Sequence, residues 1–272
     1  MKELAGPILL VGSGKMGSAL LGGWLDHGLL KTDVLVVEPS AAGREAVAGL
    51  GVEAVAGPEA LPAGLAFRAV IFAVKPQMMA DVLPAYRETV RDGTLVLSIA
   101  AGTAIERFEA AFGEATAVVR AMPNTPAAIG KGATALYANA RVSEQQRGLA
   151  EALMSAVGEV HWLEDEEQMH AVTAMSGGGP AYVFLLIETL AKAGIASGLP
   201  EALAWPMART TVIGSGALAA ASEEPAATLR KNVTSPGGTT QAALEVLMAD
   251  DGVQPLFDRA MRAASDRSRE LA

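Results

Sequence analysis

The sequence predicts an α/β protein in two parts, with a doubly wound parallel sheet at the N-terminus and an all-helical domain after it. Two observations carry this prediction. In the first part of the chain, short continuous apolar runs alternate with helix-like segments, which is typical of parallel strands that helices cover on both faces. From about Glu164 onward no strand-like run occurs, and one helical segment follows another.

Apolar periodicity and turn residues place the expected elements along the chain. Strands are expected at Ile8–Val11, Val34–Val37, Val52–Val55, Ala69–Val74, Thr94–Ile99 and Ala117–Ala121. Helices are expected between them at Met16–His27, Ala41–Leu50, Met78–Val90 and Ala104–Phe112. The helices expected in the second part are Glu166–Met175, Gly179–Ser197, Pro200–Ala221, Pro225–Asn232, Thr239–Ala249 and Pro255–Leu271. The domains are therefore expected to span residues 1–163 and 164–272.

Composition excludes several classes of function. The net charge is -9, so the chain repels phosphate backbones and nucleic-acid binding is not expected. Cysteine is absent, which excludes disulfides, thiolate catalysis and cysteine-ligated zinc, and no metal site is predicted. The first apolar run passes straight into Gly12, unlike a signal peptide, and the run Tyr182–Ile187 stops at Glu188, short of a membrane span. A cytoplasmic protein with no membrane partner is expected.

The strongest local signal is the segment VGSGKMG at residues 11–17. Its glycines, Gly12, Gly14 and Gly17, have the G-x-G-x-x-G spacing, and they follow an expected strand and open an expected helix. The first glycine permits a tight turn, the second lets the backbone approach a pyrophosphate, and the third lets helix and strand pack closely. The N–H groups of the helix N-terminus then face the anion. This pattern predicts a dinucleotide site in a Rossmann-type domain.

A carboxylate follows at the expected place for a ribose contact. Glu38 ends the second expected strand, at about the distance from the third glycine where an acid bonds the ribose 2′-OH. A carboxylate there repels a 2′-phosphate and favours NADH, whereas Ser40 and Arg44 close by are able to bind a 2′-phosphate. Glu38, Pro39 and Ser40 are predicted to line the cofactor site, and NADH and NADPH both remain open.

The residues available for chemistry favour reduction of an imine over oxidation of an alcohol. Oxidation of an alcohol needs a base, usually His or Lys, and His27, His161 and His170 are each expected to be structural. A protonated C=N group is already electrophilic, so positioning and a grip on a substrate carboxylate are sufficient. The segment SPGGTT at residues 235–240 offers hydroxyls and a helix N-terminus for such a grip, although a simple capped helix has the same pattern.

Six segments in order carry a resemblance to a known family. They are VGSGKMG at 11–17, FAVKP at 72–76, SIAAG at 98–102, RAMPNTP at 120–126, SGGGPAYVF at 176–184 and NVTSPGGTT at 232–240. In these segments the chain resembles pyrroline-5-carboxylate reductase, and the resemblance covers nearly the whole sequence. It implies reduction of 1-pyrroline-5-carboxylate to L-proline with NADPH or NADH, the last step of proline biosynthesis. It also implies a helical C-terminal domain that joins two subunits into a homodimer, and often a ring of five dimers.

The resemblance implies a role for each matched position. The cofactor residues it implies are Gly12, Ser13, Gly14, Lys15, Met16 and Gly17 at the pyrophosphate, Ala73, Val74, Lys75 and Pro76 along the nicotinamide ribose, Ile99, Ala100 and Ala101 beside the nicotinamide, and Asn124 nearby. The substrate carboxylate is expected at Ser235, Gly238, Thr239 and Thr240. Ser235 and Thr240 are the expected catalytic residues, and the Thr240 hydroxyl is expected to touch the ring nitrogen.

The sequence departs from the family pattern at two positions, and it has features that bear on two other functions. Gly178 stands where the family usually has Ser, and Gly57 stands nearest to an Asn that meets the adenosine ribose in many members. A β-hydroxyacid-type dehydrogenase should carry a catalytic Lys early in the helix after the glycine-rich turn, but no Lys occurs there before Lys192. An NAD(P)-binding regulatory protein without turnover has no need of the hydroxyls in SPGGTT. Oligomer size and activity on related cyclic imines remain open.

Overall fold

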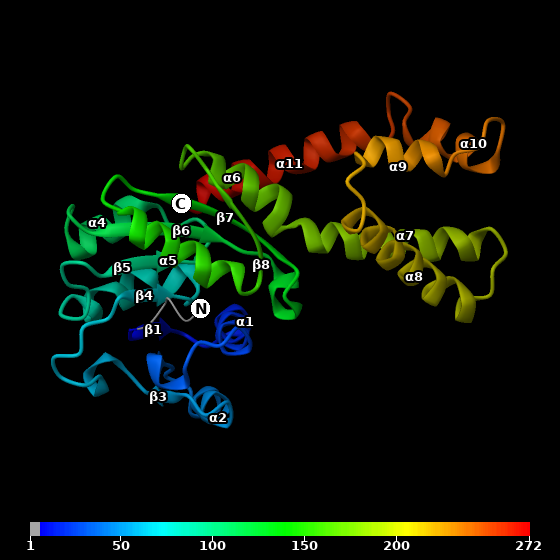
Figure 1. The fold of residues 1–272 in the computed structure, drawn as a ribbon. Helices are drawn as coiled ribbons and strands as arrows, with labels where there is room; N and C mark the ends of the chain where they lie inside the picture. Colours follow the sequence, from blue (N-terminus) through cyan, green and yellow to red (C-terminus); the bar gives the residue numbers. More distant parts are fainter. Residues whose placement is uncertain (1–5) are drawn as a thin grey trace. The chain divides into compact units, whose positions relative to one another are not determined.

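The computed structural model describes residues 6–272, which form two compact units (Figure 1). The first unit contains the chain up to Gly177 together with Ala264–Ala272, and the second contains Gly178–Ala263. The first is an α/β unit and the second is entirely helical, so the predicted fold class is confirmed.

The first unit is built on one eight-stranded sheet with the order β3-β2-β1-β4-β5-β6-β7-β8. Its strands are β1 Ile8–Val11, β2 Val34–Val37, β3 Glu53–Val55, β4 Ala69–Phe72, β5 Leu95–Ser98, β6 Ala117–Met122, β7 Gly132–Ala138 and β8 Gly158–Trp162. All neighbouring strands are parallel except β6 and β7, which are antiparallel. The strand order reverses between β1 and β4, and ligands bind at the carboxyl ends of strands on either side of such a reversal.

The central strands are apolar because helices cover both faces of the sheet. Along β1, Ile8 and Leu10 belong to one core cluster, whereas Leu9 and Val11 belong to the other. Successive side chains of a strand point to opposite faces, so the two clusters lie on opposite sides of the sheet. The helices of this unit are α1 Lys15–Asp26, α2 Ala41–Gly49, α3 Met79–Val82, α4 Ile105–Phe112, α5 Glu144–Ser155 and α6 Gln168–Val172. This arrangement is the doubly wound sheet that the sequence predicted.

The prediction of a continuous α-helix at Met78–Val90 is wrong. The chain forms a 3-10 turn at Pro76–Met78, the short helix α3, and another 3-10 turn at Leu83–Tyr86. Pro84 lies at the start of that last turn. Its nitrogen carries no hydrogen and its ring clashes with the carbonyl four residues earlier, which disfavours a continuous α-helix through this position.

Three elements of this unit were not predicted. The strands β7 and β8 were missed because neither is a continuous apolar run, and β8 alternates half-buried and exposed residues at the edge of the sheet. The helix α5 was also missed, although Ser143 and Gln146 form a capping box at its start that the sequence displays.

The second unit consists of helices whose apolar residues are largely exposed. Its helices are α7 Gly179–Ala196, α8 Glu201–Ala220, α9 Ala226–Asn232, α10 Thr239–Leu247 and most of α11 Val253–Glu270, as predicted apart from their ends. Within α7, Phe184 and Leu185 are each 60% exposed, and Ile213 of α8 is 59% exposed. Apolar faces of this size indicate contact with another molecule.

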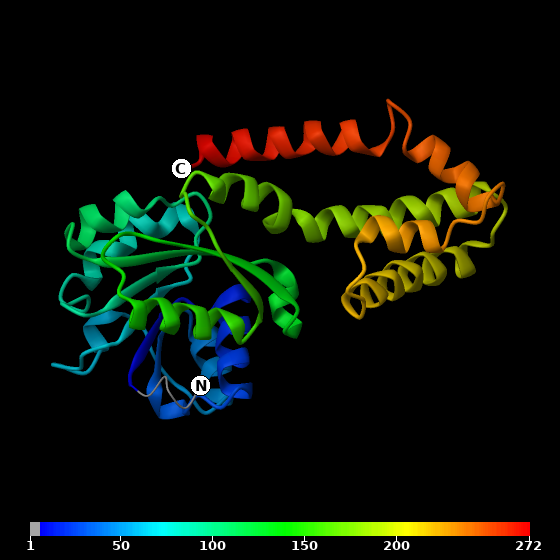
Figure 2. The ribbon, with the colours of Figure 1, turned by 45° about the horizontal axis from the view of Figure 1, so that its top comes forward.

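The chain passes from the first unit to the helical unit before α7 and returns to the first unit near the end of α11. A π-helix at Thr173–Gly177 follows α6 directly and precedes α7. At the other end of the chain, the last turns of α11 belong to the first unit and lie beside α6 (Figure 2). There the Ser268 hydroxyl hydrogen-bonds to the His170 ring at 2.8 Å.

Among residues 6–272, one helical stretch, Gln168–Ala196, is long and apolar enough to cross a membrane by length and composition. The apolar run Tyr182–Ile187 is too short by itself to span a membrane, but in the structure it is part of this longer helical stretch. An exposed apolar helix is equally suited to contact with a second protein chain.

Replacement of Trp24 by Ala tests the core. Trp24 is fully buried, and its indole N–H donates to the Leu153 carbonyl at 2.8 Å. The variant should lower the free energy of unfolding by about 3–5 kcal/mol, because it opens a cavity and leaves that carbonyl unpaired. Urea unfolding at fixed protein concentration measures the loss. Leu30→Ala, at a 63% exposed position, is the control and should change stability by less than about 0.5 kcal/mol.

Candidate functional site

The glycine-rich turn between β1 and α1 fits a pyrophosphate. Gly12 has a φ of 93°, which favours glycine, and a Cβ on Gly17 would lie 2.3 Å from the Gly12 carbonyl oxygen. A Cβ on Gly14 would meet nothing within 4 Å, so open space lies over this residue. Gly14 is also the N-cap of α1 and supplies no side-chain acceptor. The turn therefore presents helix N–H groups to open space, which is the arrangement that binds phosphate groups.

The carboxylate of Glu38 is fixed against this turn. Its Oε2 accepts hydrogen bonds from the Ser13 backbone N–H at 3.0 Å and the Ser13 hydroxyl at 2.9 Å, and its Oε1 accepts from the Ser40 N–H at 2.9 Å. Burial raises the pKa of Glu38, but these donors and the charge of Arg44 outweigh burial and hold the pKa below its usual value. Glu38 is therefore ionised at neutral pH.

Arg44 is directed at the backbone beside Glu38. Its Nη1 donates to the carbonyl oxygens of Glu38 at 2.9 Å and Pro39 at 2.6 Å. Its Nη1 thus binds the backbone, while the Glu38 carboxylate is held by other donors. The positive charge of Arg44 and the negative charge of Glu38 therefore both lie at the end of β2.

A cavity of about 360 Å³ joins the turn, the end of β2 and the end of β4. It brings together eight of the predicted cofactor residues, which are Gly12, Gly14, Glu38, Pro39, Ser40, Ala73, Val74 and Lys75. Its wall also contains Met78, Val82 and Tyr86, which were not predicted. They come from the broken helical segment after β4, and burial raises the pKa of the Tyr86 phenol, with the charge of Glu59 adding to the effect.

The remaining residues predicted around the turn do not line this cavity. The Ser13 backbone N–H and hydroxyl face Glu38, Lys15 is exposed, and Met16 is half-buried against the core. Gly17 is buried beneath the turn. These residues form and support the turn, while the open space lies over Gly14.

A second cavity of about 490 Å³ lies at the ends of β4 and β5, within the first unit. It contains Pro76 and Ala101 of the predicted set, while Ile99 and Ala100 lie just before Ala101 in the chain. The other lining residues are Gln77, Gly102, Thr103, Arg107, Thr173, Ala264, Arg267, Ser268 and Leu271. The last four belong to α11 or directly follow it. No local pattern links this end of the chain to β4 and β5, so the sequence could not predict their contribution.

The Asn124 side chain forms hydrogen bonds within the protein that the sequence did not predict. Its Nδ2 donates to the Ser176 carbonyl at 3.3 Å and the Ser176 hydroxyl at 3.2 Å, and its Oδ1 accepts from the Ala133 N–H at 2.9 Å. Asn124 lines neither of the two cavities. Its side chain links the start of β7 to the π-helix before α7.

The segment Ser235–Thr240 lies in the helical unit and is mostly exposed. Gly237 has a φ of 70°, and its N–H donates to the Gln241 side chain at 2.8 Å. Gly238 is the N-cap of α10 and supplies no side-chain acceptor to the first turn of that helix. The turn therefore presents hydroxyls and helix N–H groups together, the donor set that a small carboxylate needs.

None of the three histidines lines either cavity among the residues that the structure describes. The His27 ring hydrogen-bonds to the Gly23 carbonyl at 2.8 Å, His161 is exposed beside Glu159, and His170 is held by Ser268. Lys192, the first lysine of α7, is exposed and pairs with Glu188 at 3.6 Å.

The fold and the site define an NAD(P)-dependent oxidoreductase, since a glycine-rich turn, an acid after β2 and a cavity meet at the reversal of a parallel sheet. Two family models match the chain: "Pyrroline-5-carboxylate reductase dimerisation" at residues 166–271 and "NADP oxidoreductase coenzyme F420-dependent" at residues 7–102. The chain belongs to the pyrroline-5-carboxylate reductase family.

Relatives and solved structures agree over the whole length. The pyrroline-5-carboxylate reductase of Pseudomonas aeruginosa is 41% identical, with 97% of this chain and 96% of that protein covered. The enzyme of Haemophilus influenzae is 38% identical, with 97% of each covered. The structure of a pyrroline-5-carboxylate reductase from Coxiella burnetii has a TM-score of 0.92 at 34% identity, and covers 98% of each chain. The Plasmodium falciparum structure, with NADP bound, has a TM-score of 0.81 at 28% identity over 98% of each chain.

Alanine substitutions at Gly14 and Gly17 separate cofactor binding from folding. Gly14→Ala should leave stability unchanged but weaken NADH binding by about 10-fold or more, because the new methyl group occupies the space through which the pyrophosphate approaches. Gly17→Ala should lower the free energy of unfolding by about 1–3 kcal/mol, because its Cβ meets the Gly12 carbonyl.

Fluorescence titration with NADH and urea unfolding measure the two effects. Gly22→Ala, on the same helix with nothing within 4 Å of its Cβ, is the control and should bind NADH normally. Equal NADH affinity in Gly14→Ala and the control would place the pyrophosphate elsewhere.

Proposed function

We propose that this chain reduces 1-pyrroline-5-carboxylate to L-proline with NADH or NADPH. The proposal rests above all on the 41% identity to a pyrroline-5-carboxylate reductase over 97% of the chain. The cavity at the glycine-rich turn and the hydroxyl-bearing turn before α10 support it, because one suits a dinucleotide and the other suits a carboxylate.

The cofactor residues divide into three groups in this proposal. Residues Gly12–Gly17 hold the pyrophosphate through backbone N–H groups, and Glu38, Pro39 and Ser40 meet the adenosine ribose. Residues Ala73–Pro76 follow the nicotinamide ribose, Ile99–Ala101 form a wall beside the nicotinamide, and Asn124 supports the neighbouring backbone. The reduced nicotinamide supplies the hydride.

The substrate residues act through hydrogen bonds. Ser235, Gly238, Thr239 and Thr240 bind the substrate carboxylate with hydroxyls and N–H groups, and the Thr240 hydroxyl orients the ring nitrogen. Hydride adds to the carbon of the protonated C=N group, so the nitrogen becomes an amine without a new proton from the protein, and solvent then protonates that amine. No histidine is needed for this step, and no histidine of residues 6–272 lines either of the two cavities described above.

The two other functions receive less support. The β-hydroxyacid-type dehydrogenase needs a lysine at the reacting centre, whereas Lys192 is exposed and ion-paired to Glu188. A regulatory protein without turnover does not account for the exposed hydroxyls of Ser235, Thr239 and Thr240 at one helix start.

Assembly and location are part of the same proposal. Residues 164–272 form the substrate-binding and dimerisation domain, and two copies pair through the exposed apolar faces of α7 and α8. The larger assembly implied by the family is a decamer of five dimers, which light scattering distinguishes from the dimer. The protein acts in the cytoplasm and has neither nucleic acid nor membrane as partner.

Turnover with 1-pyrroline-5-carboxylate tests the function directly. Loss of the reduced-nicotinamide absorbance on addition of this substrate is expected with the wild type. Thr240→Ala should lower kcat/KM by about 100-fold, because a donor to the reacting group is lost, while NADH binding is retained. Ser222→Ala removes a hydroxyl of the same unit that accepts from the Glu224 N–H at 3.1 Å, away from the Ser235–Thr240 segment; it is the control and should keep full activity. Cofactor binding without turnover in the wild type would favour the regulatory protein.

Glu38 is expected to make NADH the preferred cofactor. A fixed carboxylate repels the 2′-phosphate of NADPH, by roughly 1–4 kcal/mol at about 4 Å. Glu38→Gln should therefore shift the ratio of kcat/KM values for NADH and NADPH toward NADPH by about 10-fold or more. Glu45→Gln on the exposed side of α2 removes the same charge and is the control. An unchanged ratio in Glu38→Gln would contradict the assigned ribose contact.

A further inference from the structure

The segment Ile99–Ala104, which joins β5 to α4, is held firmly at its start. The Ile99 N–H donates to the Phe72 carbonyl at 3.1 Å, and the Ala100 N–H donates to the Ser98 hydroxyl at 3.2 Å. Ser98 is 1% exposed, so its hydroxyl has little access to water. The residues proposed as the nicotinamide wall therefore begin from a fixed point at the end of β5.

The other end of the segment is held by a residue far away in the sequence. The N-cap of α4 is Ala104, which has no side-chain acceptor, and the Ile105 N–H instead donates to Oε1 of Glu166 at 2.9 Å. A carboxylate at a helix N-terminus satisfies a free N–H group and opposes the positive end of the helix dipole. Glu166 therefore replaces the cap that the local sequence of α4 lacks.

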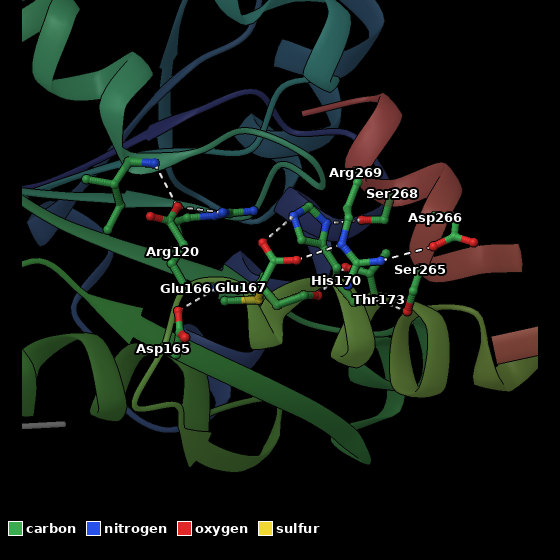
Figure 3. A network of polar contacts seen from close by, with 12 residues as sticks. Arg120, Asp165, Glu166, Glu167, His170, Thr173, Ser265, Asp266, Ser268 and Arg269 are labelled. Carbon is green, nitrogen blue, oxygen red and sulfur yellow. Dashed lines mark hydrogen bonds and ion pairs between the residues drawn. The ribbon is translucent and has the colours of Figure 1, made fainter. Parts of the chain in front are cut away.

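The same oxygen of Glu166 binds a buried guanidinium. Arg120 Nη1 donates to Oε1 of Glu166 at 2.6 Å, and the Arg120 side chain is only 5% exposed (Figure 3). Arg120 lies on β6 in register with Ser98 of β5. A guanidinium at this depth needs a charged partner, so the ion pair fixes Glu166 firmly in place. Ser98 thus holds the start of the segment Ile99–Ala104, and Glu166 holds its end. Arg120 lies beside Ser98 in the sheet and forms an ion pair with Glu166.

We propose that Glu166 is a positioning residue for hydride transfer, which fixes the segment Ile99–Ala104 beside the nicotinamide through its contacts with Ile105 and Arg120. This inference rests on the proposed function. Hydride transfer is sensitive to small displacements, and a misplacement of about 1 Å can cost roughly 100-fold in rate. Glu166 touches neither cavity and acts only through the backbone that it holds.

The neighbouring acids offer a clear contrast (Figure 3). Glu167 pairs with Arg269 of α11 at 2.6 Å, with both side chains well exposed, and this pair lowers the pKa of Glu167. Glu164 is exposed. Of these acids, Glu166 is the one that reaches the start of α4 and the buried arginine.

The test compares Glu166→Gln with Glu164→Gln, which removes the same charge from an exposed position. Glu166→Gln should lower kcat by about 10-fold and leave the dissociation constant of NADH within about 2-fold. The primary isotope effect with cofactor deuterated at C4 should rise, because hydride transfer becomes slower. The fluorescence emission of bound NADH should also shift, because the surroundings of the nicotinamide change. Glu164→Gln should match the wild type in all four measurements.

A purely structural role would give a different result. The melting temperature would then fall while kcat, the isotope effect and the emission of bound NADH stay at wild-type values well below that temperature, and this outcome would overturn the proposal. If Glu166→Gln does not fold, the double variant Arg120→Met with Glu166→Gln removes the unpaired buried charge, and the same changes are expected from it. Absence of turnover in the wild type would refute the proposed function alone, since the NADH emission reports the segment independently.

Discussion

The close contact between α1 and β1 is the constraint on which the rest of the site depends. A Cβ on Gly17 would lie 2.3 Å from the carbonyl oxygen of Gly12, and Gly12 itself has a φ of 93°, which residues with a side chain rarely adopt. This contact lets the N-terminus of α1 begin directly above the end of β1. The reversal of strand order places the ends of β2 and β4 on either side of the same point. The absence of a side chain at these two positions thus shapes the turn at which we propose that the dinucleotide binds.

The parts of the fold that follow a strong local pattern were predictable. The strands β1, β2 and β4 are continuous apolar runs, and β5 and β6 are apolar except for Ser98 and Arg120, because both faces of the sheet are covered. The sequence alone reveals all five strands. The strands β7 and β8 escape this criterion because small and polar residues interrupt them, and their pairing depends on partners far away in the chain. Pro84 shows the reverse case, where one residue overrules a helical pattern that its neighbours favour.

The same distinction applies to the candidate site. Gly12, Gly14 and Glu38 belong to motifs within one βαβ unit, so their spacing predicts their meeting, and the structure brings them together. Glu166 reaches the start of α4, and the last turns of α11 reach the cavity at the ends of β4 and β5, only through tertiary structure, so no spacing rule predicts these contacts. Asn124 belongs to a recognisable motif, yet its hydrogen bonds to Ala133 and Ser176 appear only in the folded chain.

In our proposals, the carboxylates of Glu38 and Glu166 act at a distance from the reacting atoms. Backbone N–H groups and hydroxyls are sufficient to hold a pyrophosphate and a carboxylate, and an iminium carbon accepts hydride without a protein base. Ionised side chains can then serve other purposes. In our proposals, Glu38, held by Ser13 and Ser40, affects which cofactor is accepted, whereas Glu166, held by Arg120, affects where the backbone beside that cofactor lies. Selectivity and position are thus assigned, in our proposals, to two carboxylates that hydrogen bonds hold in place.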